Sequence, residues 1–336
     1  MKRNCAIEFY RILFTAIICM HHIQGSVDAP LMKRGHLGVE LFFVLSGCFL
    51  YRSFEREAHH SLRNYIQKRV LRLYPEYIIA FIPCMIISLL EGKFSFSRAF
   101  SEIFMLQSSG YFSEEGYNYP CWYVSVLVIG GILLYQVLTV MRAQYIKLWG
   151  PIFALLVYSY LLQNGFGLEN WGMAGPIYLP LVRGIAGMTL GILVAAVGTG
   201  KGDHIIIGSI AELGSLFIIF SSIFYGIWSE NVTIIAIVVL VYVTVYRQGV
   251  ISRFLNFKVL GTLGTISYPM YLSQAFFIAV FIKVKEMFGL PGGYWWHVLL
   301  VGALFVYAFI LHYMAEFAVR AGKKLTDRIA AIRCGV

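Results

Sequence analysis

The first apolar stretch of the chain, residues 6–24, carries four ionisable side chains that could do chemistry. Glu8, Arg11 and His22 share one helical face, because residues eleven apart on an α-helix differ in direction by about 20°. Glu8 also lies at the i, i+3 pairing distance from Arg11, whereas His21 points about 100° away. Ionisable residues inside such a stretch are functional hypotheses by default, although an interfacial histidine and an arginine snorkelling to the surface would give the same pattern.

The second apolar stretch, residues 37–52, adds a carboxylate near its outer boundary. Glu40 lies about one turn inside that boundary, at the level expected for His22. A carboxylate beside an imidazole fixes its tautomer and raises its basicity, as a general base requires. We therefore predict that Glu40 pairs with His22. Deeper in, Ser46 and Gly47 form a small-residue patch of the kind that lets membrane helices approach closely.

Two further groups of basic side chains could bind anions. Arg69 and Arg72 lie on one face where the third stretch, residues 66–90, begins. Paired arginines offer forked donors for phosphates, although a positively charged membrane anchor would look the same. Arg183, inside the stretch 177–197, either contacts an anionic substrate group or pairs structurally with an acid such as Glu169.

The composition indicates which elements must position these residues. The 336 residues are 59% hydrophobic and only 13% charged, about half the charged share of a soluble domain. The apolar residues fall in stretches of the length that crosses a hydrocarbon core. We therefore predict an all-α, polytopic membrane protein, a single domain over residues 1–336, with about ten transmembrane helices. The expected spans are 6–24, 37–52, 66–90, 120–141, 148–163, 177–197, 205–226, 231–247, 259–282 and 295–317.

The distribution of charge predicts the orientation. Lys and Arg are about three times as frequent on the side of the N-terminus as on the other side, which by the positive-inside rule places both termini in the cytoplasm. The tail, about 318–336, is then cytoplasmic. The loop at about 91–119 is periplasmic, with a short amphipathic helix on the membrane surface. The net charge of +10 thus reflects topology, which disfavours nucleic-acid binding. The six cysteines show no metal-ligand spacing, and we expect no metal.

Together, the first three stretches resemble the acyltransferase-3 family of bacterial membrane enzymes. Three motifs carry this resemblance over about residues 5–80, and two weaker segments extend it along the chain. The motifs are Glu8-Phe9-Tyr10-Arg11 with His22 eleven residues later, Gly35-x-x-Gly38-Val39-Glu40-Leu41-Phe42-Phe43-Val44-Leu45-Ser46-Gly47, and Arg69-x-x-Arg72-x-x-Pro75. The weaker segments are Pro120-Cys121-Trp122-Tyr123-Val124-Ser125 and Leu263-Gly264-Thr265-Ile266-Ser267-Tyr268-Pro269-Met270-Tyr271-Leu272. Many relatives carry a histidine shortly after the last of these, where this chain has Gln274, so no catalytic role is assigned there.

The resemblance implies a multi-pass enzyme of the bacterial inner membrane. It would move an acyl group, commonly acetyl, from cytoplasmic acyl-CoA to a hydroxyl of a glycan, glycolipid or lipid-linked sugar. Arg69 and Arg72 would hold the CoA phosphates, and Ser46 and Gly47 would line a path for the pantetheine arm. Arg11 would lie near the inner half of that passage. His22, with Glu40, would act as base or carry the acyl group transiently. The candidate substrate contacts are Glu8, His21, Trp122, Tyr123, Arg183 and Tyr268.

Two other classes of protein are compatible with the charges. A transporter for a glycan or lipid precursor also holds charges at the midplane, usually with repeated halves and broken helices. No internal repeat is visible here, and the charges concentrate in the first three spans. The other alternative is a non-catalytic membrane protein of an envelope-assembly complex, against which tight CoA binding would count.

Overall fold

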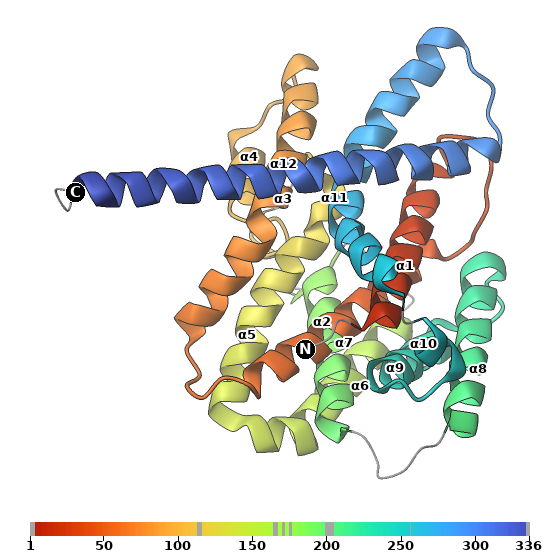
Figure 1. Cartoon of the computed structure of the whole chain (residues 1–336). Coiled ribbons are helices and arrows are strands. Elements are labelled where there is room, and N and C mark those ends of the chain that lie inside the picture. The colour runs from red at the N-terminus through yellow and green to blue at the C-terminus, as the bar shows by residue number, and fades with distance from the viewer. Residues whose placement is uncertain are drawn as a thin grey trace.

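The computed structural model describes residues 4–112, 116–163, 167–169, 172–174, 177–198, 205–255 and 257–333, and these are almost entirely helical. Figure 1 shows the helices gathered into one bundle, which the long C-terminal helix crosses. The elements are α1 (Cys5–Ile23), η1 (Gly35–Leu37), α2 (Gly38–Phe54), α3 (Leu62–Leu90), α4 (Phe96–Ile103), η2 (Tyr119–Cys121), α5 (Trp122–Gln144), η3 (Tyr145–Trp149), α6 (Gly150–Gln163), β1 (Met173–Ala174), β2 (Ile177–Tyr178), α7 (Leu179–Val197), α8 (Ile205–Tyr225), α9 (Glu230–Tyr246), α10 (Val250–Phe254), α11 (Lys258–Phe288) and α12 (Trp295–Arg333). The strands β1 and β2 form a two-residue antiparallel ladder.

Nine stretches among the described residues are long and apolar enough to cross a bilayer. One of them, Tyr119–Gln163, is 45 residues long and is interrupted at Met141, whose backbone leaves the helical region (φ −139°, ψ 39°). A π-helical turn, η3, follows, and α6 begins after it. This stretch therefore contains two of the ten predicted spans. The predicted all-α polytopic fold is confirmed, while the orientation of the termini stays a prediction. Residues 334–336 of the predicted tail lie outside the described part of the chain.

The helices α2 and α7 cross in direct backbone contact. A methyl group added at Gly47 would lie 1.8 Å from the carbonyl oxygen of Met188, and one at Gly191 would lie 1.9 Å from that of Val44. A glycine from each helix therefore permits this crossing, as small residues do in membrane bundles. The expectation that Gly47 lines a substrate path is thus wrong, because its open side is filled by the backbone of α7.

The short helix α4 has its polar side inward and its apolar side outward. Ser101 and Glu102 are fully buried, whereas Phe96 and Phe100 are 75% and 41% exposed. The rings of Phe96 and Phe100 stack at 6.4 Å, and Phe104 continues the row at 4.8 Å from Phe100. This arrangement is the reverse of a helix that faces water. An apolar row of this kind is suited to enter lipid, and the placement of α4 at the membrane surface stays a prediction.

Candidate active site

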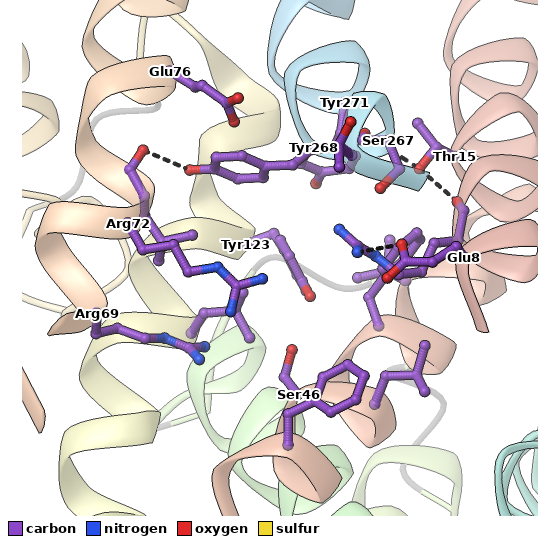
Figure 2. Close-up of a pocket in the computed structure, with 18 of the residues that line it drawn as sticks. Glu8, Thr15, Ser46, Arg69, Arg72, Glu76, Tyr123, Ser267, Tyr268 and Tyr271 are labelled. Atoms are coloured by element: carbon purple, nitrogen blue, oxygen red, sulfur yellow. Dashed lines mark hydrogen bonds and ion pairs between the residues drawn. The ribbon is translucent and has the colours of Figure 1, made fainter. Parts of the chain in front are cut away.

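A cavity of about 360 Å³ opens between the first, second, third, fifth, eleventh and twelfth helices. Seven of the predicted site residues line it: Glu8, Arg11, Ser46, Arg69, Arg72, Tyr123 and Tyr268. Figure 2 shows the residues that it labels among them converging from different helices on one space: Glu8, Ser46, Arg69, Arg72, Tyr123 and Tyr268. The three motifs near the amino terminus therefore meet in the folded chain. The remaining predicted residues, His21, His22, Glu40, Gly47, Trp122 and Arg183, do not line this cavity.

The basic side of the cavity belongs to α3. Arg69 and Arg72 project from that helix toward Tyr123 and Ser46 (Figure 2). The Nε atom of Arg69 is buried and has no hydrogen-bond partner among the residues that the structure describes. An arginine nitrogen that is withdrawn from water and left unpaired is costly unless a ligand supplies the acceptor. The α3 side of the cavity is therefore suited to an anion.

A second charged pair lies opposite, on α1. The Nη1 atom of Arg11 donates to the Oε2 atom of Glu8 at 2.7 Å. Gly264 of α11 makes room for this carboxylate, because a methyl group there would lie 2.1 Å from the Oε2 atom of Glu8 and 2.3 Å from its Cβ. Only a glycine fits at position 264 without displacing Glu8. The close packing of α11 at this position holds the Glu8–Arg11 pair at the wall of the cavity.

Hydroxyl groups form the rest of the polar lining. The Tyr123 and Ser46 hydroxyls face each other across the α5–α2 contact (Figure 2). The Tyr268 hydroxyl donates to the carbonyl oxygen of Leu73 at 3.3 Å and so joins α11 to α3. On the α1 side, the Thr15 hydroxyl lies 2.9 Å from the carbonyl oxygen of Arg11. The cavity thus combines positive charge at α3 with neutral hydrogen-bonding groups farther along α1 and α11.

Sequence reasoning missed several residues of the lining, most clearly an ion pair between α3 and α12. The Nδ1 atom of His312 lies 2.5 Å from the Oε1 atom of Glu76, and both residues line the cavity. His312 is an ionisable residue inside the last predicted span, and such residues are functional hypotheses by default. The sequence therefore contained the information needed to select it, as it did for Arg183. Thr15, Ser267 and Tyr271 were also missed as lining residues, because uncharged residues give no such signal.

His22 lies beyond the cavity, toward the other end of α1. It follows Thr15 by seven residues, about 10 Å along the axis at 1.5 Å per residue. Its Nδ1 atom lies 2.8 Å from the Oε1 atom of Gln274 on α11, and its ring meets the edge of Tyr119 at 5.5 Å. In this arrangement Nδ1–H donates to the amide oxygen, which leaves Nε2 as the basic nitrogen. The histidine is therefore directed into the protein and is held by Gln274.

The predicted pairing of Glu40 with His22 is wrong. Glu40 is fully buried, and its Oε1 atom lies 2.5 Å from Nε of Arg183. Its Oε2 atom accepts a hydrogen bond from the Tyr158 hydroxyl at 2.7 Å. Arg183 also donates to the carbonyl oxygen of Leu168. Both oxygens of Glu40 are thus occupied by α7 and α6 groups.

Arg183 consequently does not pair with Glu169, which was the structural alternative, nor does it reach the cavity. Its guanidinium carbon lies 5.7 Å from the centre of the Trp122 ring, a cation–π distance. Trp122 in turn meets Phe43 edge-on at 5.9 Å. Both residues therefore belong to the packing between α2, α5 and α7 in this structure.

Glu169 instead gathers two histidines near the outer end of α1. Its Oε1 atom lies 3.3 Å from Nε2 of His21 and 2.8 Å from Nδ1 of His36. Glu230 approaches the other nitrogen of His36 at 3.4 Å. The His21 and His36 imidazoles hold the pKa of Glu169 well below its usual range. The cluster therefore ties the segment 167–169 to α1, η1 and α9.

The ligand atoms of His21, His36 and Glu169 lie within 4.8 Å of one another, a spacing that a metal ion would need. However, the Oε1 atom of Gln24 accepts from two backbone N–H groups at 3.2 and 3.1 Å. Its NH₂ group therefore faces Nδ1 of His21, 3.2 Å away, and donates to it. The proton of the neutral His21 ring is then on Nε2, the nitrogen that faces Glu169. A metal ion would have to displace this proton, and the contacts instead describe a hydrogen-bonded cluster around Glu169.

A buried acid positions the segment that carries Tyr119. Both carboxylate oxygens of Glu102 accept backbone hydrogen bonds, from Tyr117 N–H at 2.6 Å and Asn118 N–H at 2.9 Å. The amide of Asn118 then donates to the carbonyl oxygen of Leu272 on α11 at 2.8 Å. Glu102 thus links α4 to the residues directly before η2, and through them to the ring that touches His22.

The buried Glu102 carboxyl group should make the folded protein less stable as the pH rises. Burial raises the pKa of Glu102 to about 7 from an ordinary value of 4.5, although the two backbone donors and Arg98 oppose the shift. The folded chain then holds a proton that the unfolded chain releases, so the stabilisation is complete below pH 4.5 and is lost as the pH rises through 7. The full loss is about 3 kcal/mol at about 1.36 kcal/mol per pKa unit. Thermal midpoints between pH 5 and 8 should fall, and Glu102→Gln should flatten the curve. Equal slopes in both proteins would contradict the prediction.

Comparison with known proteins gives one match. A family model described as "Acyltransferase domain" (Acyl_transf_3) matches residues 6–314. Searches of curated proteins and of solved structures gave no match. The matched range includes every lining residue of the cavity, and also His22 and Gln274.

Proposed function

Because this chain belongs to the acyltransferase-3 family and is therefore a membrane acyltransferase, we propose that it transfers an acetyl group from acyl-CoA to a hydroxyl of a glycan or glycolipid. The observation that carries this proposal is the cavity in which Arg69 and Arg72 face Ser46 and Tyr123. The acceptor is a surface sugar or a lipid-linked precursor, and the enzyme acts in the bacterial inner membrane. The side rich in Lys and Arg is its cytoplasmic side.

The donor binds at the α3 side of the cavity. CoA carries several phosphate groups, and arginine is the side chain best suited to bind them with two parallel hydrogen bonds. The unpaired Nε atom of Arg69 is a donor that such a phosphate would satisfy. Arg11 is already paired with Glu8, so it contributes less free positive charge. The acyl end of the donor then points along Ser46 and Tyr123, away from α3.

The acceptor hydroxyl is activated by His22. Its Nε2 atom accepts the hydroxyl proton while the oxygen attacks the thioester carbonyl carbon. The carbon–sulfur bond breaks, CoA leaves as a thiolate, and that thiolate finally takes the proton from the imidazolium. Gln274 holds Nδ1–H throughout and so keeps Nε2 basic. The donor and acceptor thus approach from opposite ends of α1.

The direct test uses the purified chain in lipid nanodiscs with acetyl-CoA labelled in the acetyl group. We expect label on an added glycan acceptor, or slow hydrolysis of the thioester when no acceptor is present. Movement of a glycan or lipid precursor across a vesicle membrane without label transfer would instead support a transporter. Mass spectrometry of the host's surface glycans, with and without the protein, would then identify the acetylated sugar.

Removing the arginines should weaken donor binding and leave the chemical step nearly intact. We expect Arg69→Ala and Arg72→Ala each to raise KM for acetyl-CoA about 10- to 100-fold, because a hydrogen bond to a charged group contributes about 1.5–3 kcal/mol. The kcat value should change less than threefold. Arg63→Ala is the matched control, since Arg63 is an exposed arginine of the same helix outside the cavity. An unchanged KM in both cavity variants would disprove the donor assignment.

A further inference from the structure

The cavity ends short of His22, at a wall of side chains from α1, α5 and α11. Thr15 and Tyr271 are the lining residues farthest along α1 and α11 toward His22 and Gln274. Cys19, one turn beyond Thr15 on α1, is 2% exposed and belongs to the same buried cluster as Met270, the residue before Tyr271. The acyl carbonyl carbon and an acceptor hydroxyl bound at the His22 imidazole must therefore meet at this wall, the first from the cavity and the second from the His22 side.

Tyr271 connects the two sides of the wall. It is 5% exposed, and its ring meets the Tyr123 ring edge-on at 5.5 Å. Its hydroxyl donates to the carbonyl oxygen of Pro120 at 2.9 Å. Pro120 follows Tyr119, whose ring contacts His22 at 5.5 Å. One face of Tyr271 thus belongs to the donor cavity, and its hydroxyl is attached to the segment that holds the His22 ring.

We propose that the Tyr271 ring closes the outer end of the donor cavity and sets the length of the acyl group that the enzyme transfers. This inference rests on the proposed function. A two-carbon acyl group ends before the ring, whereas each further methylene must occupy space that the ring fills. Discrimination of one methylene by a packed apolar wall amounts to about 10- to 200-fold in kcat/KM.

The ring and the hydroxyl have separable roles. The Pro120 carbonyl oxygen also accepts the backbone N–H of Trp122, so Tyr271→Phe leaves that oxygen satisfied. The Phe variant retains the ring, the part of the side chain that obstructs the acyl group. Shortening the side chain removes the obstruction itself. Tyr271→Phe is therefore the conservative control, and Tyr271→Ala and Tyr271→Leu are the informative variants.

The experiment measures kcat/KM with acetyl-, butyryl- and hexanoyl-CoA for each protein in nanodiscs. We expect the ratio of butyryl to acetyl activity to rise at least tenfold in Tyr271→Ala and Tyr271→Leu, and to stay within twofold of the unmodified protein in Tyr271→Phe. The Leu variant keeps much of the packing, so the test holds even if the Ala variant does not fold.

Tyr145→Ala is the matched control for loss of a buried tyrosine. Tyr145 is 7% exposed, its hydroxyl contacts that of Thr189 at 2.7 Å, and it lies outside the cavity lining. This variant should lose stability with no change in the chain-length ratio. An unaltered ratio in both shortened Tyr271 variants would overturn the assignment. Absence of any acyl-CoA binding or turnover in the unmodified protein would instead count against the proposed function.

Discussion

Replacing His22 with alanine should lower acyl transfer about a thousandfold while the protein still folds and binds CoA. A positioned general base contributes about 10²- to 10⁴-fold to a reaction rate, and His22 is the histidine whose Nδ1 is held by Gln274. The donor cavity does not include His22. The loss should therefore appear in kcat, with KM for acetyl-CoA unchanged. Single-turnover transfer of labelled acetyl, together with equilibrium CoA binding, measures the two quantities separately.

Two variants separate the chemical role of His22 from the packing around it. His21→Ala changes the adjacent ring, which faces Glu169, and it should leave transfer within about fivefold of the unmodified rate. Gln274→Leu removes the partner of Nδ1 but keeps the imidazole, so we expect an intermediate loss of about 10- to 100-fold. Full turnover in His22→Ala would show that the base is wrongly assigned, and His21 would then be the next candidate.

Helix positions were predictable from the sequence, because the length of each apolar stretch records them directly. The expected spans 6–24 and 37–52 agree closely with α1 and α2. The shared face of Glu8 and Arg11 was also predictable, since it depends only on 3.6 residues per turn. The paired arginines of α3 line the cavity, and their binding of phosphates stays a prediction.

Contacts between helices were not predictable, because a single amino-acid sequence does not show which face of a helix packs against which neighbouring helix. Glu40 was expected at the level of His22, but it points to α7, where Arg183 lies 143 positions later in the chain. The partner of His22 is Gln274, 252 positions away. The sequence comparison singled out Gln274 only as a departure from relatives. Its role as a partner of His22 follows from the contact between α1 and α11.

Breaking the Glu40–Arg183 ion pair should strongly destabilise the folded protein. Breaking a buried ion pair by removing one partner costs about 3–5 kcal/mol, because an uncompensated charge remains. Glu40 and Arg183 have side-chain exposures of 1% and 5%, so neither charge can be solvated in place. We therefore expect Glu40→Leu and Arg183→Leu each to lower the thermal midpoint strongly and to reduce the yield of folded protein. Tyr158→Phe, which removes only the hydroxyl bonded to Glu40, should cost about 1.5–3 kcal/mol, because the hydrogen bond goes to a charged group.

The double variant Glu40→Leu/Arg183→Leu distinguishes this structural role from a catalytic one. It removes both charges together, and replacing a whole buried pair by apolar residues is often neutral. Its midpoint should therefore lie above those of both single variants, although the Leu168 carbonyl oxygen also loses its Arg183 donor. If the carboxylate only supports α2 against α7, the folded double variant retains acyl transfer within about tenfold of the unmodified rate. A Glu40→Leu protein with normal stability and no turnover would show instead that the carboxylate takes part in the reaction.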